Sequence, residues 1–373
     1  MNNMSRRDFV RVAGGGTLLL AVGSAGLLAA CDPGALRAPD ANGLQLQPGF
    51  TSRIIATTGQ PVASTGYVWH ASPDGGACFA LADGGWSYVS NCESIPGGAG
   101  FVRFASDGTI TGAGSCLTGT IVNCAGGGTP WGTWLSCEEH PAGQVWECDP
   151  LGATAGVARP AMGRFSHEAV AVDAANQCVF LTEDRSDGGL YRFSPATWPN
   201  LASGTLAILT ETAGALAWVT VPDPSGAIGT TRTQVPNTKH FNGGEGAAMS
   251  DGRLIFTTKG DNRVWSYDPA ANALRVVYDP AVKVNGVLRG VDNVTSSSTG
   301  VIYVAEDGGD MQIVLVRNNG DTYAVVQVTG VTGSEITGPA FDPSGTRLYF
   351  SSQRNPGRTY EVAGPWSRFA SRL

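Results

Sequence analysis

The sequence predicts an all-β fold, a six-bladed β-propeller with a metal site at the mouth of its central channel. A short β-prone segment that ends in a small residue occurs six times. The segments are Trp86–Ser90, Gly132–Ser136, Val179–Thr182, Leu254–Thr257, Ile302–Ala305 and Leu348–Ser351. Their last residues are 46, 46, 75, 48 and 46 positions apart, and a period of about 40–50 residues is typical of propeller blades.

The composition agrees with this architecture. A chain of 373 residues is long enough to bury the core of a six-bladed ring. Its 52 glycines suit many tight turns between short strands. No long amphipathic helix is predicted after the N-terminal segment, which argues against helical and α/β folds. The net charge of −7, without a Lys/Arg cluster, argues against a nucleic-acid partner.

The first thirty residues have the features of an export signal. Arg6 and Arg7 precede an apolar stretch that runs to Ala30, as in twin-arginine signals, and a lipoprotein cleavage box ends in Cys31. We expect residues 1–30 to be a signal peptide, 31–50 a tether, and 51–373 the propeller. The expected location is the periplasm, with a lipid on Cys31 as the only membrane contact, at the inner membrane. An ordinary cleavage site is the alternative.

Seven cysteines follow Cys31, so at least one thiol is free or is a ligand. Up to three disulfides are possible in an oxidising compartment, and the pairs considered are Cys116–Cys124, Cys148–Cys178 and Cys78–Cys92. The alternative is that several thiols are small buried apolar groups. Cys137 stands out because it lies beside Glu138 and Glu139 at a repeated position.

Acidic residues recur at two positions of the repeat. At the first, directly after the small residue, the chain reads Asn91-Cys92-Glu93, Cys137-Glu138-Glu139, Glu183-Asp184, Thr258-Lys259, Glu306-Asp307 and Ser352-Gln353. The second lies 12 to 14 residues before the small residue, and it holds Glu168, Glu245, Asp292 and Gly338-Pro339. A tight turn separates the two positions, so an antiparallel hairpin brings both to the same face of the ring.

Carboxylates that meet around one channel repel one another unless cations lie between them. Many oxygen ligands suit Ca²⁺, and one thiolate among carboxylates suits a transition metal such as iron. A structural zinc site fits poorly because paired Cys-x-x-Cys spacing is absent. The candidate ligands from this pattern are Glu93, Cys137, Glu138, Glu168, Glu183, Asp184, Glu245, Asp292 and Glu306.

The 75-residue interval predicts an insertion at about residues 195–241. It is expected at the surface, either as a blade extension or as a cover over the channel mouth. His167, which precedes Glu168 at a strand start, has two interpretations. It either orients a ligand or substrate, or it is a structural histidine.

Several motifs resemble those of the PhoX-type alkaline phosphatases (the DUF839 family), of which the chain looks like a short member. The motifs are Pro130–Glu139, Gly163–Ala169, Leu181–Asp184, Leu190–Phe193 and Glu335–Phe341. The resemblance runs from about Gly75 to Gly357 and includes the twin-arginine signal. It implies a six-bladed propeller whose channel mouth holds a ferric pair and calcium ions, and which hydrolyses phosphate monoesters.

The resemblance also implies residue roles. Cys137 becomes an iron ligand, and Glu335 joins the candidate ligands of iron or calcium. Lys259, His167 and Arg185 become the candidate catalytic residues that contact phosphate. Metal cations would neutralise the phosphoryl oxygens and stabilise charge on the leaving oxygen. The expected partner is a small-molecule phosphate ester, and the protein is expected to be a monomer.

Three departures from the family pattern put the exact activity in doubt. The family tends to have Arg-Pro-Glu where this chain reads Gly243-Gly244-Glu245, so a phosphate-binding arginine is missing. It also tends to have His where Cys92 stands, and Gln-His-Pro-Gly near Gln353–Gly357.

Two alternatives stay open at this point. One is a lactonase-like propeller hydrolase with a single calcium, which requires no thiolate. The other is a calcium-stiffened binding or scaffold propeller without turnover, in which calcium removal lowers stability only.

Overall fold

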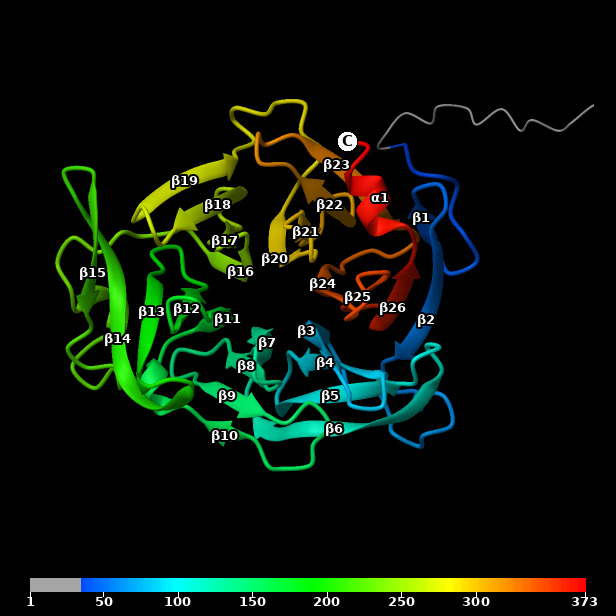
Figure 1. Cartoon of the computed structure of the whole chain (residues 1–373), viewed down its shortest axis with the longest axis horizontal. Coiled ribbons are helices and arrows are strands. Elements are labelled where there is room, and N and C mark those ends of the chain that lie inside the picture. Colours follow the sequence, from blue (N-terminus) through cyan, green and yellow to red (C-terminus); the bar gives the residue numbers. More distant parts are fainter. Residues whose placement is uncertain (1–34) are drawn as a thin grey trace, which may run out of the picture. The chain divides into compact units, whose positions relative to one another are not determined.

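The computed structural model describes residues 35–373, which form six antiparallel sheets. The sheets surround a common centre like the blades of a propeller, and each places one strand next to that centre (Figure 1). The predicted six-bladed propeller is therefore confirmed. The predicted signal peptide and Cys31 lie outside the described residues. Within residues 35–373, no helix is both long enough and apolar enough to cross a membrane.

The first three blades follow one another along the chain, each running from the centre outward. Blade one contains β3 (Pro73–Ala80), β4 (Trp86–Cys92), β5 (Gly97–Phe104) and β6 (Ile110–Thr120). Blade two contains β7 (Asn123–Gly128), β8 (Trp134–Glu138), β9 (Val145–Cys148) and β10 (Val157–Ala158). Blade three contains β11 (His167–Asp173), β12 (Cys178–Glu183), β13 (Leu190–Thr197), β14 (Asn200–Thr212) and β15 (Ala215–Thr220).

The other three blades complete the ring. Blade four contains β16 (Gly244–Ser250), β17 (Arg253–Thr258), β18 (Arg263–Asp268) and β19 (Ala273–Tyr278). Blade five contains β20 (Val291–Ser296), β21 (Ile302–Glu306), β22 (Gln312–Val316), β23 (Thr322–Val328) and β1 (Leu44–Leu46). Blade six contains β24 (Ile336–Phe341), β25 (Arg347–Ser352), β26 (Arg358–Ala363) and β2 (Thr51–Thr57). The short helices are η2 (Pro160–Met162), η3 (Thr231–Thr233) and α1 (Trp366–Ala370).

The N-terminal strands close the ring. β2 pairs with β26, so blade six combines the two ends of the propeller, and β1 pairs with β23 in blade five. Residues 44–46, which the sequence placed in a tether, are therefore part of a sheet. Leu44 and Leu46 alternate with a less buried residue, as a strand with one buried face requires, and both belong to the core cluster that contains Trp366 of α1.

The repeated segments of the sequence are the second strands of the blades. β4, β8, β12, β17, β21 and β25 are buried along almost their whole length because each has a strand on both sides and a blade on both faces. The core fills the space between blades. Tyr88 of blade one, for example, stacks on Tyr349 of blade six at a ring distance of 5.1 Å.

The predicted insertion extends blade three. β14 is 13 residues long, and β15 adds a fifth strand to the sheet. Trp218 of β15 donates a hydrogen bond to the Tyr267 hydroxyl of blade four at 2.8 Å. The insertion therefore also contacts the next blade.

One irregularity recurs in all six blades. The pairing of each innermost strand with the second strand shifts by one residue at a β-bulge, between Pro73/Gly76, Asn123/Gly126, His167/Val170, Gly244/Ala247, Val291/Val294 and Thr337/Ala340. A bulge redirects a side chain out of the regular alternation of a strand. Six bulges at the same position therefore place six residues around the channel.

Candidate metal centre

The first residue of each bulge belongs to what we call the inner ring. Its members are Asp74, Cys124, Glu168, Glu245, Asp292 and Gly338. The four carboxylates and the thiol of Cys124 are buried or nearly so, with exposed fractions from 1% for Glu168 to 9% for Cys124. Side chains of blades three, four and five meet here, since Glu168, Glu245 and Asp292 offer oxygens within 4.8 Å of one another.

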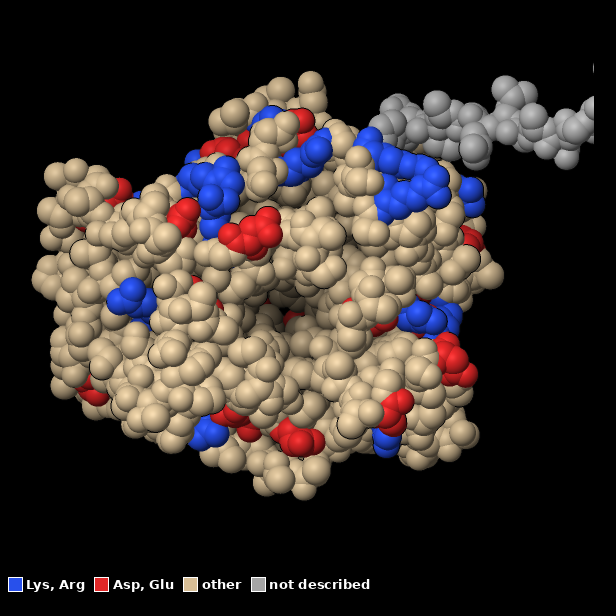
Figure 2. Space-filling model, in the orientation of Figure 1, with Lys and Arg blue, Asp and Glu red and all other residues tan. Residues whose placement is uncertain are grey.

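The residue that directly follows each second strand belongs to the outer ring. Its members are Glu93, Glu139, Asp184, Lys259, Asp307 and Gln353. Together with Glu335, which precedes β24, the two rings form what we call the acidic band. Figure 2 shows an opening at the centre of the molecule with acidic atoms inside it.

Four overlapping groups make the acidic band continuous. In each group, one potential ligand atom per residue lies within 4.8 Å of the others. The groups are Glu168/Glu245/Asp292, Asp292/Asp307/Glu335, Asp74/Glu93/Glu335 and Glu93/Cys124/Glu139. Because successive groups share Asp292, Glu335 and Glu93, more than one cation can be accommodated side by side.

Two basic side chains contact the band. Lys259 Nζ lies 2.8 Å from Glu245 Oε1 and 3.2 Å from Asp184 Oδ2. Arg354 Nη2 lies 2.6 Å from Glu335 Oε1 and 3.6 Å from Glu93 Oε2. The positive charges of Lys259 and Arg354 cannot neutralise the nine carboxylates of the acidic band, so the protein's own side chains leave a large excess of negative charge there.

The proton affinities of the carboxyl groups reflect this excess. Burial and then the charge of Asp184 raise the pKa of Glu139 to about 7. Burial raises the pKa of Asp292 to about 7. The positive charge of Lys259 opposes this increase, and the negative charges of Asp307 and Glu93 add to it. Burial and the charges of Asp292 and Asp307 raise the pKa of Glu335 to about 9. Neighbouring negative charges and low solvation thus disfavour ionisation, and bound cations would reverse the preference.

The most buried members show the same effect more strongly. Burial, followed by the repulsion of other ring carboxylates, raises the pKa of Asp74, Glu168 and Glu245 well above the ordinary range. Glu168 Oε2 is buried without a hydrogen-bond partner, while Glu168 Oε1 accepts a hydrogen bond from Cys124 Sγ at 3.2 Å. An unpartnered buried oxygen and a thiol at the same place form a donor set that fits metal ions.

The predicted thiol ligand is corrected by the structure. Cys137 is fully buried in an apolar cluster with Leu135 and Val145 and belongs to none of the four groups. It lies two positions before Glu139 of the outer ring. The thiol of the acidic band is Cys124, which the bulge of β7 directs into the channel.

From the sequence, Cys124 was considered instead as a disulfide partner of Cys116. All seven cysteines from Cys78 to Cys178 have free thiols in the structure. None of the three disulfide pairs considered from the sequence is formed. Six of these thiols are buried, which agrees with the alternative that several act as small apolar groups.

Glu138, Glu183 and Glu306 were predicted as metal ligands but hold the loops of their own blades. Glu138 accepts hydrogen bonds from the backbone N–H groups of residues 121 and 144, and Glu306 from those of residues 289 and 312. Glu183 accepts from the backbone of residue 189, the Tyr191 hydroxyl and Arg232. Each is the last residue of its second strand, so its side chain points away from that of the ring residue that follows.

The three predicted catalytic residues are placed differently. Lys259 lies in the acidic band. Arg185 directly follows Asp184 and donates a 2.6 Å hydrogen bond to Ser166 Oγ. His167 is fully buried, contacts the carbonyl of Gly163 at 3.0 Å and stacks on Phe165, and burial lowers its pKa to about 3. The structure therefore favours a structural role for His167.

Asp74, Cys124, Glu139 and Asp307 belong to the acidic band but were not among the predicted ligands. Asp74 and Cys124 stand at the first positions of the bulges in β3 and β7, which carry no acidic motif comparable with those of Glu168 and Glu245. The distance of 12 to 14 residues before the small residue could have found Cys124, which lies 12 positions before Ser136, but not Asp74, which lies 16 positions before Ser90. In β3 and β7, however, an Asp-Gly-Gly and a Cys-Ala-Gly-Gly sequence resembles a turn rather than a strand.

The missing arginine at position 243 has a local explanation. Gly243 has a φ of +72°, and a Cβ there would lie 3.2 Å from Lys259 Cγ. Any side chain at this position would be strained by its backbone. Lys259, which lies beside Gly243, carries a positive charge at this point of the mouth.

Comparison with known proteins agrees with this geometry. The family model of alkaline phosphatase PhoX matches residues 94–144 and 140–273. The structure of Pseudomonas fluorescens PhoX in complex with vanadate, a transition state analogue, aligns with a TM-score of 0.74 and 15% identity, over 89% of this chain and 97% of that chain. A protein of unknown function from Bacteroides thetaiotaomicron aligns with a TM-score of 0.55 and 10% identity, over 84% and 76% of the respective chains. No curated protein sequence matches the chain.

Proposed function

The chain belongs to the PhoX-type alkaline phosphatase family, and from this premise we propose that it is a metal-dependent hydrolase of phosphate monoesters. The observation that carries the proposal is the acidic band at the channel mouth, in which carboxylates from around the ring and the thiol of Cys124 lie close together and Lys259 pairs with Glu245 and Asp184. Such a band requires cations, and phosphoryl oxygens require the same positive environment.

We propose calcium and iron as the resident ions. The group that contains Cys124, with Glu93 and Glu139, combines a soft thiolate with carboxylates and fits iron. The groups made only of carboxylates fit Ca²⁺, which prefers several oxygen ligands. When bound, these ions would supply Lewis-acid stabilisation of negative charge on phosphate oxygens.

Side chains of the protein itself bind and orient the phosphoryl group of the substrate. Lys259 is 39% exposed and Arg354 is 46% exposed, so both basic groups reach the solvent side of the band, while the inner ring lies below them. Each can donate N–H hydrogen bonds to a phosphoryl oxygen. Gln353 Nε2 donates to Asp74 Oδ2 at 2.5 Å and to Glu93 Oε2 at 2.6 Å, which fixes two carboxylates of the band relative to each other.

The first experiment is elemental analysis of the protein purified without chelators, combined with hydrolysis of p-nitrophenyl phosphate. We expect calcium and iron together, and hydrolysis that is lost on chelation and restored by the two metals. Lys259→Met should lower kcat/KM about a hundredfold, whereas Lys283→Met, whose Nζ pairs with Asp321 in a separate pocket, should leave it unchanged. Calcium without iron, and no hydrolysis of any phosphate ester, would overturn the proposal and favour the lactonase-like or binding propeller.

We also propose that the protein is exported by the twin-arginine route, anchored in the periplasm by a lipid on Cys31, and active as a monomer. The support for the export route and the lipid anchor is the sequence of residues 1–31. Replacement of Arg6 and Arg7 by lysine should leave the protein in the cytoplasm, and Cys31→Ser should release it from the membrane fraction. Light scattering of the purified protein measures its oligomeric state, and a stable dimer would contradict the last part.

A further inference from the structure

A pocket of about 360 Å³ beside the acidic band has the opposite charge. Three arginines line it, Arg164, Arg185 and Arg232, together with Phe165, Ser166 and Glu183. We call it the arginine pocket. One wall comes from the segment 225–232, which belongs to the connection that follows the extra strand β15. The blade-three insertion therefore helps to build it.

The charges of the arginine pocket are only partly balanced. Arg232 Nη1 lies 2.8 Å from Glu183 Oε1, and Arg232 Nε lies 2.9 Å from Asp187 Oδ1. Arg164 and Arg185 form no ion pair within residues 35–373. The lining therefore carries two positive charges in excess, in a chain whose net charge is −7.

The two unpaired guanidinium groups have free donors. Arg185 uses one N–H toward Ser166 Oγ, and Arg164 Nη1 is 3.5 Å from the carbonyl of Ala142, which is a long hydrogen bond. A guanidinium group has five N–H donors in a planar fork that matches a carboxylate or a phosphate. Most of these donors are left for a ligand.

The arginine pocket adjoins the acidic band through the backbone. Ser166 forms an isolated β-bridge with Glu139 of the outer ring, and its carbonyl accepts a hydrogen bond from the Asp184 N–H at 3.2 Å. Arg185 is the next residue after Asp184. Two residues of the pocket are thus direct neighbours of two residues of the band, so one small molecule can reach both.

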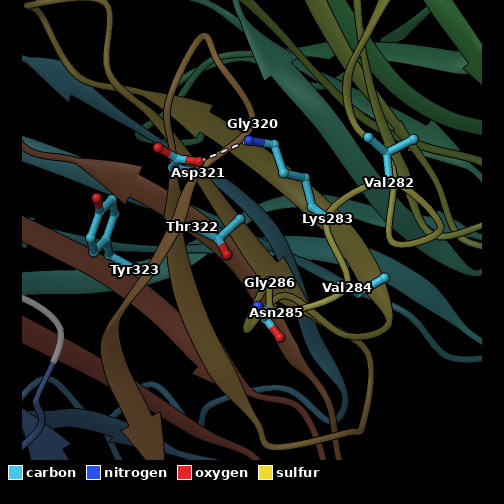
Figure 3. A pocket seen from close by; sticks show the side chains of 9 residues that line it. All are labelled: Val282, Lys283, Val284, Asn285, Gly286, Gly320, Asp321, Thr322 and Tyr323. Atoms are coloured by element: carbon cyan, nitrogen blue, oxygen red, sulfur yellow. Dashed lines mark hydrogen bonds and ion pairs between the residues drawn. The ribbon is translucent and has the colours of Figure 1, made fainter.

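Another pocket of the molecule lacks this charge. It is lined by the connection after β19 and by the β22–β23 turn, and its Lys283 is paired with Asp321 at 2.8 Å (Figure 3). Val282 and Val284, also in its lining, are largely exposed. An excess of unpaired arginine is therefore a property of the site next to the band, not of every hollow in the surface.

We propose that the arginine pocket binds a second anionic group on the alcohol part of the substrate. The inference rests on the proposed function and refines it, because the favoured substrates become phosphate monoesters whose alcohol carries a carboxylate or another phosphate. The phosphoryl group lies at the acidic band with its metals, and the second anion lies between Arg164 and Arg185. Pro141 and Ala142, which are exposed and also line the pocket, give the carbon part of the substrate an apolar surface.

The test compares two substrates, 4-carboxyphenyl phosphate and its methyl ester, in which a methyl group removes the second negative charge. We expect the metal-loaded enzyme to prefer the carboxylate, and Arg164→Gln to reduce that preference about tenfold while kcat/KM for the ester stays constant. The matched control is Arg253→Gln, an exposed arginine paired with Asp268 on blade four. Equal kcat/KM for the two substrates, unaffected by Arg164→Gln, would overturn the proposal while the phosphatase function stands.

A binding measurement separates this proposal from the phosphatase function. 4-Hydroxybenzoate, the dephosphorylated product, is titrated calorimetrically into the wild-type protein and into the Arg164→Gln and Arg253→Gln variants. Binding that is lost only in Arg164→Gln supports the arginine pocket even if neither phosphate ester is hydrolysed. If neither ester is hydrolysed and 4-hydroxybenzoate does not bind, both proposals fail.

Discussion

Cys124 and Cys137 are 13 positions apart and have different environments, because they lie on different strands of blade two. Cys124 is the first residue of a bulge on the innermost strand of blade two, and it contacts Glu168. Cys137 lies on the second strand, surrounded by Leu135 and Val145. The same thiol chemistry is therefore available to a metal at one position and enclosed in apolar side chains at the other.

The first prediction compares Cys124→Ser with Cys137→Ser. Cys124→Ser should lose iron, because a hydroxyl is a poor replacement for a thiolate, with little loss of fold. Cys137→Ser should keep its metals but lower the free energy of unfolding by about 1–3 kcal/mol, since it buries a hydroxyl in an apolar cluster. Elemental analysis and urea unfolding measure the two effects. Loss of iron in Cys137→Ser alone would restore the ligand that the motif implied.

At the scale of the element, the bulges are held by contacts from one blade to the next. Thr182 Oγ1 donates to the carbonyl of Glu245 at 2.6 Å, and Asn91 Nδ2 donates to the carbonyl of Cys124 at 3.0 Å. In both cases a side chain on a second strand supports the bulge of the following blade. The inner ring is thus positioned by the neighbouring sheet as well as by its own strand.

The second prediction tests this close packing with Gly246→Ala. A Cβ at Gly246 would lie 2.6 Å from Asn293 Cα, in the backbone of the next bulge, so blades four and five would have to move apart. We expect the free energy of unfolding to fall by about 1–3 kcal/mol and metal content to fall with it, as measured by urea unfolding and elemental analysis.

Gly112→Ala on the outer strand β6 is the matched control for Gly246→Ala. A Cβ at Gly112 would meet only Arg103 Cβ, at 3.7 Å. A change within about 0.5 kcal/mol is expected for it. Equal losses of stability in the two variants would show that the inner ring is not closely packed.

At the scale of the whole molecule, the acidic band couples stability to pH and to metal. In metal-free protein, the pKa values of Glu139, Asp292 and Glu335 are raised to about 7, 7 and 9, above those of the unfolded chain. The folded state therefore binds more protons than the unfolded state between pH 4 and pH 9. Stability falls as pH rises through this range, because the carboxyl groups must ionise while crowded and buried.

The third prediction follows from that sign. Chelator-treated protein should unfold in urea with a free energy lower at pH 8 than at pH 5, by about 3 kcal/mol or more, since two units of pKa shift in a single carboxyl group are already worth about that much. Restoring calcium and iron should remove most of the difference, because the bound cations stabilise the ionised carboxylates. A metal-free protein that is more stable at pH 8 than at pH 5 would contradict the assignment of the band.

The repeat and the ring could be predicted from the sequence because they depend on local pattern. The small residues at the ends of Trp86–Ser90 and its five counterparts mark second strands, and the period is visible without any contact information. The structure also brings Glu93, Glu168, Glu245, Asp292 and Glu335 together and places Asp184 against Lys259, whereas their role as metal ligands stays a prediction. Antiparallel hairpins bring the two repeated positions to one face whatever the details of the blades.

The remaining site residues depended on geometry that the pattern does not contain. In Glu138-Glu139 and Glu306-Asp307, either acid could face the channel, and the alternation of the strand makes the first hold a loop and the second join the band. The bulge adds one residue to the innermost strand, which moves Cys124 and Asp74 into the ring. A shift of one residue reverses the direction of a side chain, so a motif alone could not assign them.

The sequence by itself determined that this protein is a six-bladed propeller with crowded carboxylates at one end, because repeat length, turn residues and charge are properties of the chain. Only the tertiary structure decided which thiol joins the carboxylates and that β1 and β2 close the ring. It also decided that Arg164, Arg185 and Arg232 surround one pocket, although up to 68 positions separate them in the chain. Such choices depend on bulges and on contacts between blades, which bring together residues that are distant in sequence.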